Sequence, residues 1–198
     1  MKKKLFFTMI LLVAAVWIFG PAADADAPKK LPKKLVIFDE GGSIYAITGW
    51  MGDGMNAVKM ENVRKRPHGG KYCLKFTYNA KKGKKEGWAG VYWQYPPDNW
   101  GDKKGLDLSR YKKVSFWARG EKGGEVINVR VGGCDGGDIP DTFCREVKEI
   151  HLNSEWKQIT ITFKGDDLSN VSGAFCWSVD SSANPKGCTF YLDDIVYE

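Results

Sequence analysis

The sequence has few of the residues from which enzymes assemble a catalytic centre. It contains two histidines, His68 and His151, and the first lies between Pro67 and Gly69, which is typical of a turn. No GxSxG, HExxH or Cys/His/Asn pattern occurs, and no CxxC or Cys/His spacing indicates a zinc site. Nothing in the sequence pairs a nucleophile with a base, so a catalytic role is the less favoured interpretation.

Long helical periods are also lacking. Short runs instead alternate between apolar and polar residues, and Gly, Asp, Asn and Pro separate them. The runs are KLVIFDE, KYCLKFTYN, GVYWQY, KKVSFWARG, VINVRVGG, REVKEIHL, KQITITF, GAFCWSVD and TFYLDDIVY. Because β-branched and aromatic residues dominate runs of this length and spacing, they predict an all-β protein with an antiparallel β-sandwich or a barrel.

An apolar run at the N-terminus is too short and too close to the start to favour a transmembrane helix. It covers residues 5–19, follows Lys2, Lys3 and Lys4, and precedes the small residues of PAADADA. This order is typical of a bacterial signal peptide, which we predict over residues 1–25. We therefore expect a secreted or periplasmic protein with no membrane span after cleavage; an uncleaved membrane anchor is the alternative.

A strong charge of one sign is not present. The formal net charge of the chain is +6, and loss of the signal peptide would remove three lysines and Asp24. Other lysines concentrate in KKLPKK, within a predicted flexible linker over residues 26–34, and in KKGKK, at a predicted loop tip. Basic clusters can bind nucleic acid, but solvated loop charge is the favoured interpretation, so we predict no nucleic-acid partner. Residues 35–198 suffice for one domain with a sizeable core.

The cysteines are odd in number. Export would favour disulfides, yet five thiols leave one free or paired with a second chain. The five are Cys73, Cys134, Cys144, Cys176 and Cys188. Cys134 with Cys144, or Cys176 with Cys188, are nearest in sequence, whereas Cys134 and Cys176 share the outward parity of their predicted strands, so the pairing stays open.

Alternation assigns one side of each predicted strand to the core and the other to the outside. The outward positions carry flat aromatics, amides and guanidinium groups, where an ordinary solvated face would favour Thr, Lys and Glu. This outward set is Tyr92, Gln94, Trp117, Arg119, Asn128, Arg130, Ser178 and Asp180. If the strands share one sheet, such a face suits a sugar, whose C–H face stacks on Trp or Tyr while its hydroxyls pair with amides, guanidinium groups and carboxylates.

The stretch GWAGVYWQYPPDNWGD, residues 87–102, contributes most of the aromatics. Trp93 and Tyr95 have core parity, whereas Tyr92 faces outward, and Trp88 and Trp100 would add to the binding face from the strand end and a loop. The alternative is that a loop, residues 95–102 included, covers Trp117 and that the arginines pair with carboxylates.

Acidic residues stand at both ends of the predicted domain. Asp39 and Glu40 belong to the first strand, and Asp193 and Asp194 to the last. Terminal strands of a sandwich often meet, and Ca²⁺ takes six to eight oxygen ligands. These acids are therefore candidate calcium ligands, with ordinary strand-edge charges as the alternative.

Three segments carry a resemblance to a known family. They are IFDE at residues 37–40, GWAGVYWQYP…NWGD followed by LDLSRYKKVSFWARGEKGGEVINVRVGG, and the closing EWKQITITF…VSGAFCWSV…TFYLDDIVYE. Over residues 35–198 the chain resembles bacterial galactose-binding-like jelly-roll domains, a group with many non-catalytic carbohydrate-binding modules. The resemblance implies a concave sheet face or loop-end pocket for glycans. It also implies a structural calcium ion near Asp39 or Glu40 and near Asp193.

These observations predict an antiparallel jelly-roll β-sandwich that is secreted, non-catalytic and binds a polysaccharide or cell-surface glycan. An envelope structural or protein-interaction domain of the same fold is the alternative. A small glycosidase is a third interpretation, but it needs two facing carboxylates about 5–10 Å apart, and the outward set offers only Asp180.

Overall fold

The computed structural model describes residue 28 and residues 30–83 and 85–198. The predicted signal peptide and residues 26, 27 and 29 of the predicted linker lie outside this range. The elements are β1 (Leu35–Phe38), β2 (Ala46–Gly52), α1 (Gly54–Ala57), β3 (Val58–Val63), β4 (Cys73–Tyr78), β5 (Trp88–Gln94), β6 (Lys113–Gly120), β7 (Val126–Gly132), β8 (Cys144–His151), β9 (Lys157–Thr162), β10 (Gly173–Asp180) and β11 (Cys188–Tyr197). No helix within the described residues is long and apolar enough to cross a membrane.

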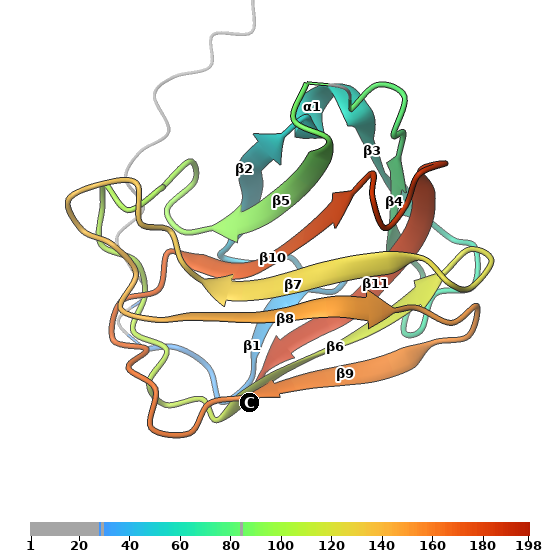
Figure 1. The fold of residues 1–198 in the computed structure, drawn as a ribbon. Helices are drawn as coiled ribbons and strands as arrows, with labels where there is room; N and C mark the ends of the chain where they lie inside the picture. Colours follow the sequence, from blue (N-terminus) through green and yellow to red (C-terminus); the bar gives the residue numbers. More distant parts are fainter. Residues whose placement is uncertain (1–27, 29, 84) are drawn as a thin grey trace, which may run out of the picture.

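The strands form two antiparallel sheets that face each other as a sandwich (Figure 1). Sheet A has the order β3-β4-β11-β6-β9, with β1 also paired to β11, and sheet B has the order β2-β5-β10-β7-β8. Neighbouring strands come from distant parts of the chain, and the chain repeatedly crosses between the sheets, as in a jelly roll. The predicted all-β, antiparallel jelly-roll sandwich is confirmed.

The core lies between the sheets and is rich in aromatic rings. Trp93 of β5 and Phe175 and Trp177 of β10 point inward from sheet B and are fully buried. Phe116 of β6 meets Phe175 with ring centroids 5.0 Å apart, and Phe76 of β4 meets Trp177 at 4.7 Å. These cross-sheet contacts follow directly from the alternation in the sequence, because every second residue of a strand points to the same face.

One assumption about the strands is wrong. β5, β7 and β10 adjoin in sheet B, but β6 lies in sheet A between β11 and β9. The chain crosses from one sheet to the other between the end of β5 at Gln94 and the start of β6 at Lys113. Trp117 and Arg119 of β6 are therefore on the opposite surface of the sandwich from Tyr92. Alternation decides which side of a strand is buried, whereas strand pairing is a long-range choice that it does not encode.

Candidate functional site

The outward side of sheet B gathers most of the predicted ligand-binding residues. Cys176 of β10 lies opposite Tyr92 on one side and Arg130 on the other, and Ser178 lies opposite Asn128. Figure 1 shows β10 between β5 and β7 in this sheet. The sheet thereby unites six of the predicted residues, which are Trp88, Tyr92, Gln94, Asn128, Arg130 and Asp180.

Tyr92 lies on this side of the sheet, but its ring is covered. It is 1% exposed, its hydroxyl donates to the carbonyl of Gly132 at 2.9 Å, and Trp100 packs edge-on against it with centroids 5.8 Å apart. A Cβ on Gly173 would lie 2.8 Å from the Tyr92 ring, so a glycine there makes room for the tyrosine. The expectation that Tyr92 stacks on a ligand therefore does not match its position, because the loop after β5 folds back over it.

Gln94 is likewise buried, and it supports that loop. Its side-chain amide donates to the Asn99 carbonyl at 2.9 Å and its carbonyl accepts from the Thr48 hydroxyl at 2.9 Å. The Asn99 side chain in turn accepts the backbone N–H groups of residues 101, 102 and 103. These bonds hold the loop that carries Trp100 against one end of the face.

The remainder of this side we call the sheet B floor, made of Met51, Trp88, Gly90, Asn128, Arg130 and Ser178; all but Gly90 are at least partly exposed. Gly90 occupies its middle, and a Cβ there would lie 2.7 Å from the terminal carbon of Met51 and 2.9 Å from the Trp177 carbonyl oxygen. Trp88 begins β5 and is 36% exposed. Four residues of strand, about 13 Å at 3.3 Å per residue, separate Trp88 from Tyr92, over which Trp100 lies. Two tryptophans thus stand at the two ends of a floor whose central residue, Gly90, is buried under the Met51 side chain.

The polar groups of the floor lie toward β7 and β8. The Asn128 side-chain carbonyl accepts the Glu149 N–H at 2.9 Å, and its amide lies 3.5 Å from the Ser178 hydroxyl. Arg130 pairs with Glu146 of β8 at 3.3 Å. About two fifths of the Arg130 side chain is exposed (39%), so the guanidinium retains donors for another partner.

Trp117 and Arg119 belong to a separate, closed cluster on the outer side of sheet A. The His68 ring stacks on Trp117 with centroids 3.7 Å apart. Arg119 is 2% exposed and lies between the Tyr191 ring, 3.6 Å from its centroid, and the Trp156 ring, at 5.1 Å. The alternative in which a loop covers Trp117 is the one observed, but the loop is the β3–β4 connection rather than residues 95–102.

The candidate metal ligands do converge. Asp39 and Glu40 after β1 line a pocket of about 220 Å³ together with Asp193 and Asp194 of β11. The pairing of β1 with β11 brings the two ends of the domain together. Asp193 is 2% exposed and accepts the His68 N–H at 2.8 Å. Its burial, together with the negative charge of Asp194, raises the pKa of the Asp193 carboxyl.

The acidic pocket has the type of ligand atom that a hard cation prefers, but its carboxylates are not arranged to hold one. A Cβ on Gly69 would lie 2.9 Å from an Asp194 oxygen, and one on Gly70 would overlap Glu40, so only the Gly-Gly loop can approach the acids so closely. Oxygen donors of this kind suit Ca²⁺. The carboxylates are engaged by backbone N–H groups, however, and among the described residues no three His, Cys, Asp or Glu are arranged to hold a metal ion.

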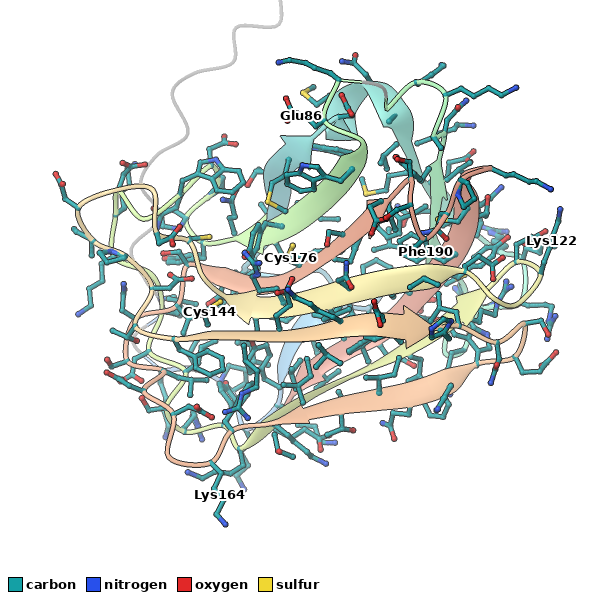
Figure 2. All side chains as sticks on the ribbon, viewed as in Figure 1. Glu86, Lys122, Cys144, Lys164, Cys176 and Phe190 are labelled. Carbon is teal, nitrogen blue, oxygen red and sulfur yellow. The ribbon has the colours of Figure 1, made fainter. Side chains whose placement is uncertain are left out.

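All five cysteines are free thiols in the structure. Cys144 is exposed at the start of β8, whereas the other four are buried. Burial raises the pKa of Cys134 to about 12 and that of Cys73 to about 11. Cys134 and Cys176 both pack against Tyr92, and Figure 2 labels Cys144 and Cys176. The disulfide pairings and the intermolecular thiol partner stay predictions.

The sequence reasoning missed the contributions of the two edge strands of sheet B. Met51 of β2 belongs to the floor, and Glu146 and Lys148 of β8 border it, yet none was a candidate. Alternation in REVKEIHL could have placed Glu146 and Lys148 outward, but Glu149 has a positive φ of 54° that interrupts the alternation. Gly90 was missed because glycine carries no side chain from which to argue.

No protein-family model matches the sequence, and no curated protein matches it. Solved structures do match. The family 11 carbohydrate-binding module of Clostridium thermocellum, in complex with a β-1,3-1,4-mixed-linked tetrasaccharide, has a TM-score of 0.56 at 16% identity, covering 83% of this chain and 94% of that chain. The family 30 module of the cellulosomal cellulase Cel9D-Cel44B of C. thermocellum has a TM-score of 0.55 at 18% identity, covering 83% and 96%. The chain therefore has the jelly-roll β-sandwich fold of these carbohydrate-binding modules.

Proposed function

We propose that the protein is a secreted, non-catalytic carbohydrate-binding module and that the sheet B floor binds a polysaccharide or cell-surface glycan. The observation that carries the proposal is the position of exposed Trp88 and half-buried Trp100 at the two ends of the sheet B floor, which polar groups border. A pyranose ring can lie flat on such a floor, with its C–H face against an indole and its hydroxyls toward the bordering polar groups. The length of the floor favours several sugar units of one linear chain.

The roles of the predicted residues differ within this proposal. Trp88 stacks on one sugar, and Trp100 contacts another from the loop. Asn128, Arg130 and Asp180 pair with hydroxyls. Tyr92 and Gln94 support the floor and the Trp100 loop, while Trp117 and Arg119 stabilise the opposite surface.

The carboxylates near the floor do not suit glycoside hydrolysis. A glycosidase needs an acid whose pKa is raised to near neutrality. Burial alone would raise the pKa of Asp180, but hydrogen bonds from Ser182 and Ala183 lower it below its usual value. Glu146 is paired with Arg130 and Lys148. A binding role without catalysis is the function that these groups support.

The direct test is affinity electrophoresis against a panel of polysaccharides, starting with a mixed-linkage β-glucan because the family 11 module was solved with such a tetrasaccharide. Trp88→Ala should weaken binding tenfold or more, about the effect of removing a central aromatic contact. Trp156→Ala, on the opposite surface, is the matched control and should bind normally. Equal loss in both variants, or no binding to any glycan, would favour the protein-interaction alternative.

A structural Ca²⁺ in the acidic pocket is a second part of the proposal. Asp39, Glu40 and Asp193 would supply oxygen ligands, and the ion would offset the repulsion among the clustered carboxylates. Because these residues come from the two ends of the domain, a bound ion would join the first strand to the last.

A further inference from the structure

A pocket of about 440 Å³ lies at one end of the sandwich, and its lining shares no residue with the floor or with the acidic pocket. It opens between the end of β4, the start of β11 and the β6–β7 turn, elements that meet at one side of Figure 1. Its lining is Thr77, Tyr78, Asn79, Lys81, Glu121, Lys122, Glu125, Lys186, Gly187, Cys188 and Thr189. This volume falls within the range of about 300–1,000 Å³ that is usual for small-ligand sites.

The pocket carries an excess of unpaired positive charge. Lys81, Lys122 and Lys186 line it and are exposed, and no ion pair joins any of them to another described residue. The two glutamates of the lining are already engaged. Glu121 pairs with Lys65 at 2.9 Å and accepts the Tyr191 hydroxyl. Three lysines therefore face one opening without acidic partners.

Glu125, the second glutamate of the lining, is held by backbone N–H groups. Its two oxygens accept the N–H groups of Lys122 and Gly123, each at 2.9 Å. These bonds close the β6–β7 turn and fix where Lys122 leaves the backbone. The carboxylate thus shapes the turn, and the backbone N–H groups stabilise its negative charge.

The lining of the pocket also offers neutral polar groups and a glycine, Gly187. The Thr77 and Thr189 hydroxyls lie 3.4 Å apart across β4 and β11, and Asn79 stands beside them in the lining. Gly187 has a φ of 78°, and a Cβ there would lie 2.3 Å from the Tyr78 carbonyl oxygen. Hydroxyl and amide groups in a pocket that three lysines also line match a ligand that has both hydroxyls and a negative charge.

We propose that this pocket binds the anionic group of an acidic sugar unit, either a uronate carboxylate or a sulfate ester, in a polysaccharide chain. The inference rests on the proposed glycan-binding function, to which it adds a second site and a charge class. Lys122 and Lys186 contact the anionic group, and Thr77, Thr189 and Asn79 bind ring hydroxyls. Lys82, exposed next to Lys81, extends the positive surface beside the pocket.

The test compares two doubly substituted chains that lose the same charge. Lys122→Gln/Lys186→Gln removes two lysines of the pocket, and Lys157→Gln/Lys164→Gln removes two exposed lysines of the β9 region. Figure 2 labels Lys122 and Lys164 at well separated places on the molecule. Binding of polygalacturonate, dextran sulfate, a neutral β-glucan and a DNA duplex is measured by calorimetry at an ionic strength of about 0.1 M, where charges are screened beyond about 10 Å.

We expect the pocket variant to bind polygalacturonate or dextran sulfate about tenfold more weakly, as the loss of two exposed charge contacts implies, and the control variant to bind as the parent chain does. Whichever of the two polymers responds identifies carboxylate or sulfate as the group bound. Neutral β-glucan binding should be unchanged in both variants. If no neutral glycan binds, but binding of the acidic polymer still depends on the pocket lysines, the proposed function of the sheet B floor is wrong and the second site is supported.

Three outcomes would overturn the second site. The first is no binding of either acidic polymer. The second is an equal loss in the two variants, which would indicate general surface charge. The third is tight DNA binding through the same lysines, which would indicate an unselective polyanion surface. Acidic-polymer binding that is lost in Trp88→Ala but kept in the pocket variant would place the ligand on the sheet B floor instead.

Discussion

At the scale of single residues, the hydrogen bonds of Asn99 shape one end of the candidate site. It is buried, its carbonyl oxygen accepts three backbone N–H groups, and its amide donates to the Tyr95 carbonyl, the Lys103 carbonyl and the Ser172 hydroxyl. One short side chain therefore organises the loop that presents Trp100. Its role in binding is indirect, since it contacts only protein groups.

Asn99→Ala should lower the free energy of unfolding by about 2–4 kcal/mol, because several buried donors and acceptors would lose their partners at once. It should also weaken glycan binding, since the Trp100 loop would lose its position. Urea denaturation checks the first expectation and affinity electrophoresis the second. Asn56→Ala, at an exposed residue of α1, is the control. Equal stability of the two variants would show that the loop is held by other contacts.

The thiols provide a second test at this scale. Only Cys144 is exposed, and burial raises the pKa of Cys134 and of Cys188 to about 12. Because the thiolate is the reactive form, a thiol reagent such as DTNB at pH 8 should label one cysteine quickly in the folded protein and all five after denaturation. Cys144→Ser should remove the fast phase. Fewer than five reactive thiols in denaturant would instead reveal a disulfide.

At the scale of elements, the β3–β4 connection links two features of sheet A. Its His68 and Gly69 N–H groups donate to Asp193, and the His68 ring covers Trp117. The same loop therefore lines the acidic pocket and closes the aromatic cluster. A change at Asp193 should affect both.

The proposed calcium site predicts a thermal shift. The melting temperature should be higher with Ca²⁺ than with a chelator, since a ligand bound only by the folded state stabilises it. Asp193→Asn should abolish the difference, whereas Asp135→Asn, in an exposed loop, should preserve it. The absence of any shift in the parent chain would exclude a stabilising site. Fluorescence of Trp117 would report whether the β3–β4 loop changes with the metal.

At the scale of the whole molecule, the segment before β1 is partly attached to the sandwich. The Tyr111 hydroxyl donates to the Pro32 carbonyl at 2.7 Å, Arg110 donates to the Leu31 carbonyl, and Leu31 packs on the core. The predicted linker over residues 26–34 is therefore not wholly a free tether. Residues 31 and 32 extend the domain beyond its predicted start at residue 35.

A chain that begins at Leu35 should be less stable than one that begins at residue 26, by about 1–2 kcal/mol, since it loses a hydrogen bond to a buried tyrosine and an apolar contact. Differential scanning calorimetry of the two chains measures the difference. Tyr111→Phe in the longer chain isolates the hydrogen bond. Identical melting temperatures would mean that residues 31 and 32 contribute no stability.

The local periodicity of the sequence determined the fold class and which residues form the core. The alternation in GVYWQY and GAFCWSVD placed Trp93, Phe175 and Trp177 inside, and the spacing of short runs indicated two antiparallel sheets, because a strand must bury one face and leave the other outside. The acids near the two termini were expected to meet, and the pairing of β1 with β11 brings them to one pocket.

Only the tertiary structure decided which outward residues share a surface and which of them a ligand can reach. Because β6 lies in sheet A, Trp117 and Arg119 are not on the candidate face. The loop that Asn99 holds in place covers Tyr92. Alternation is a property of one strand, whereas strand pairing and loop coverage depend on contacts between residues far apart in the sequence. The sheet B floor around Gly90 arises from those contacts, and no local pattern encodes them.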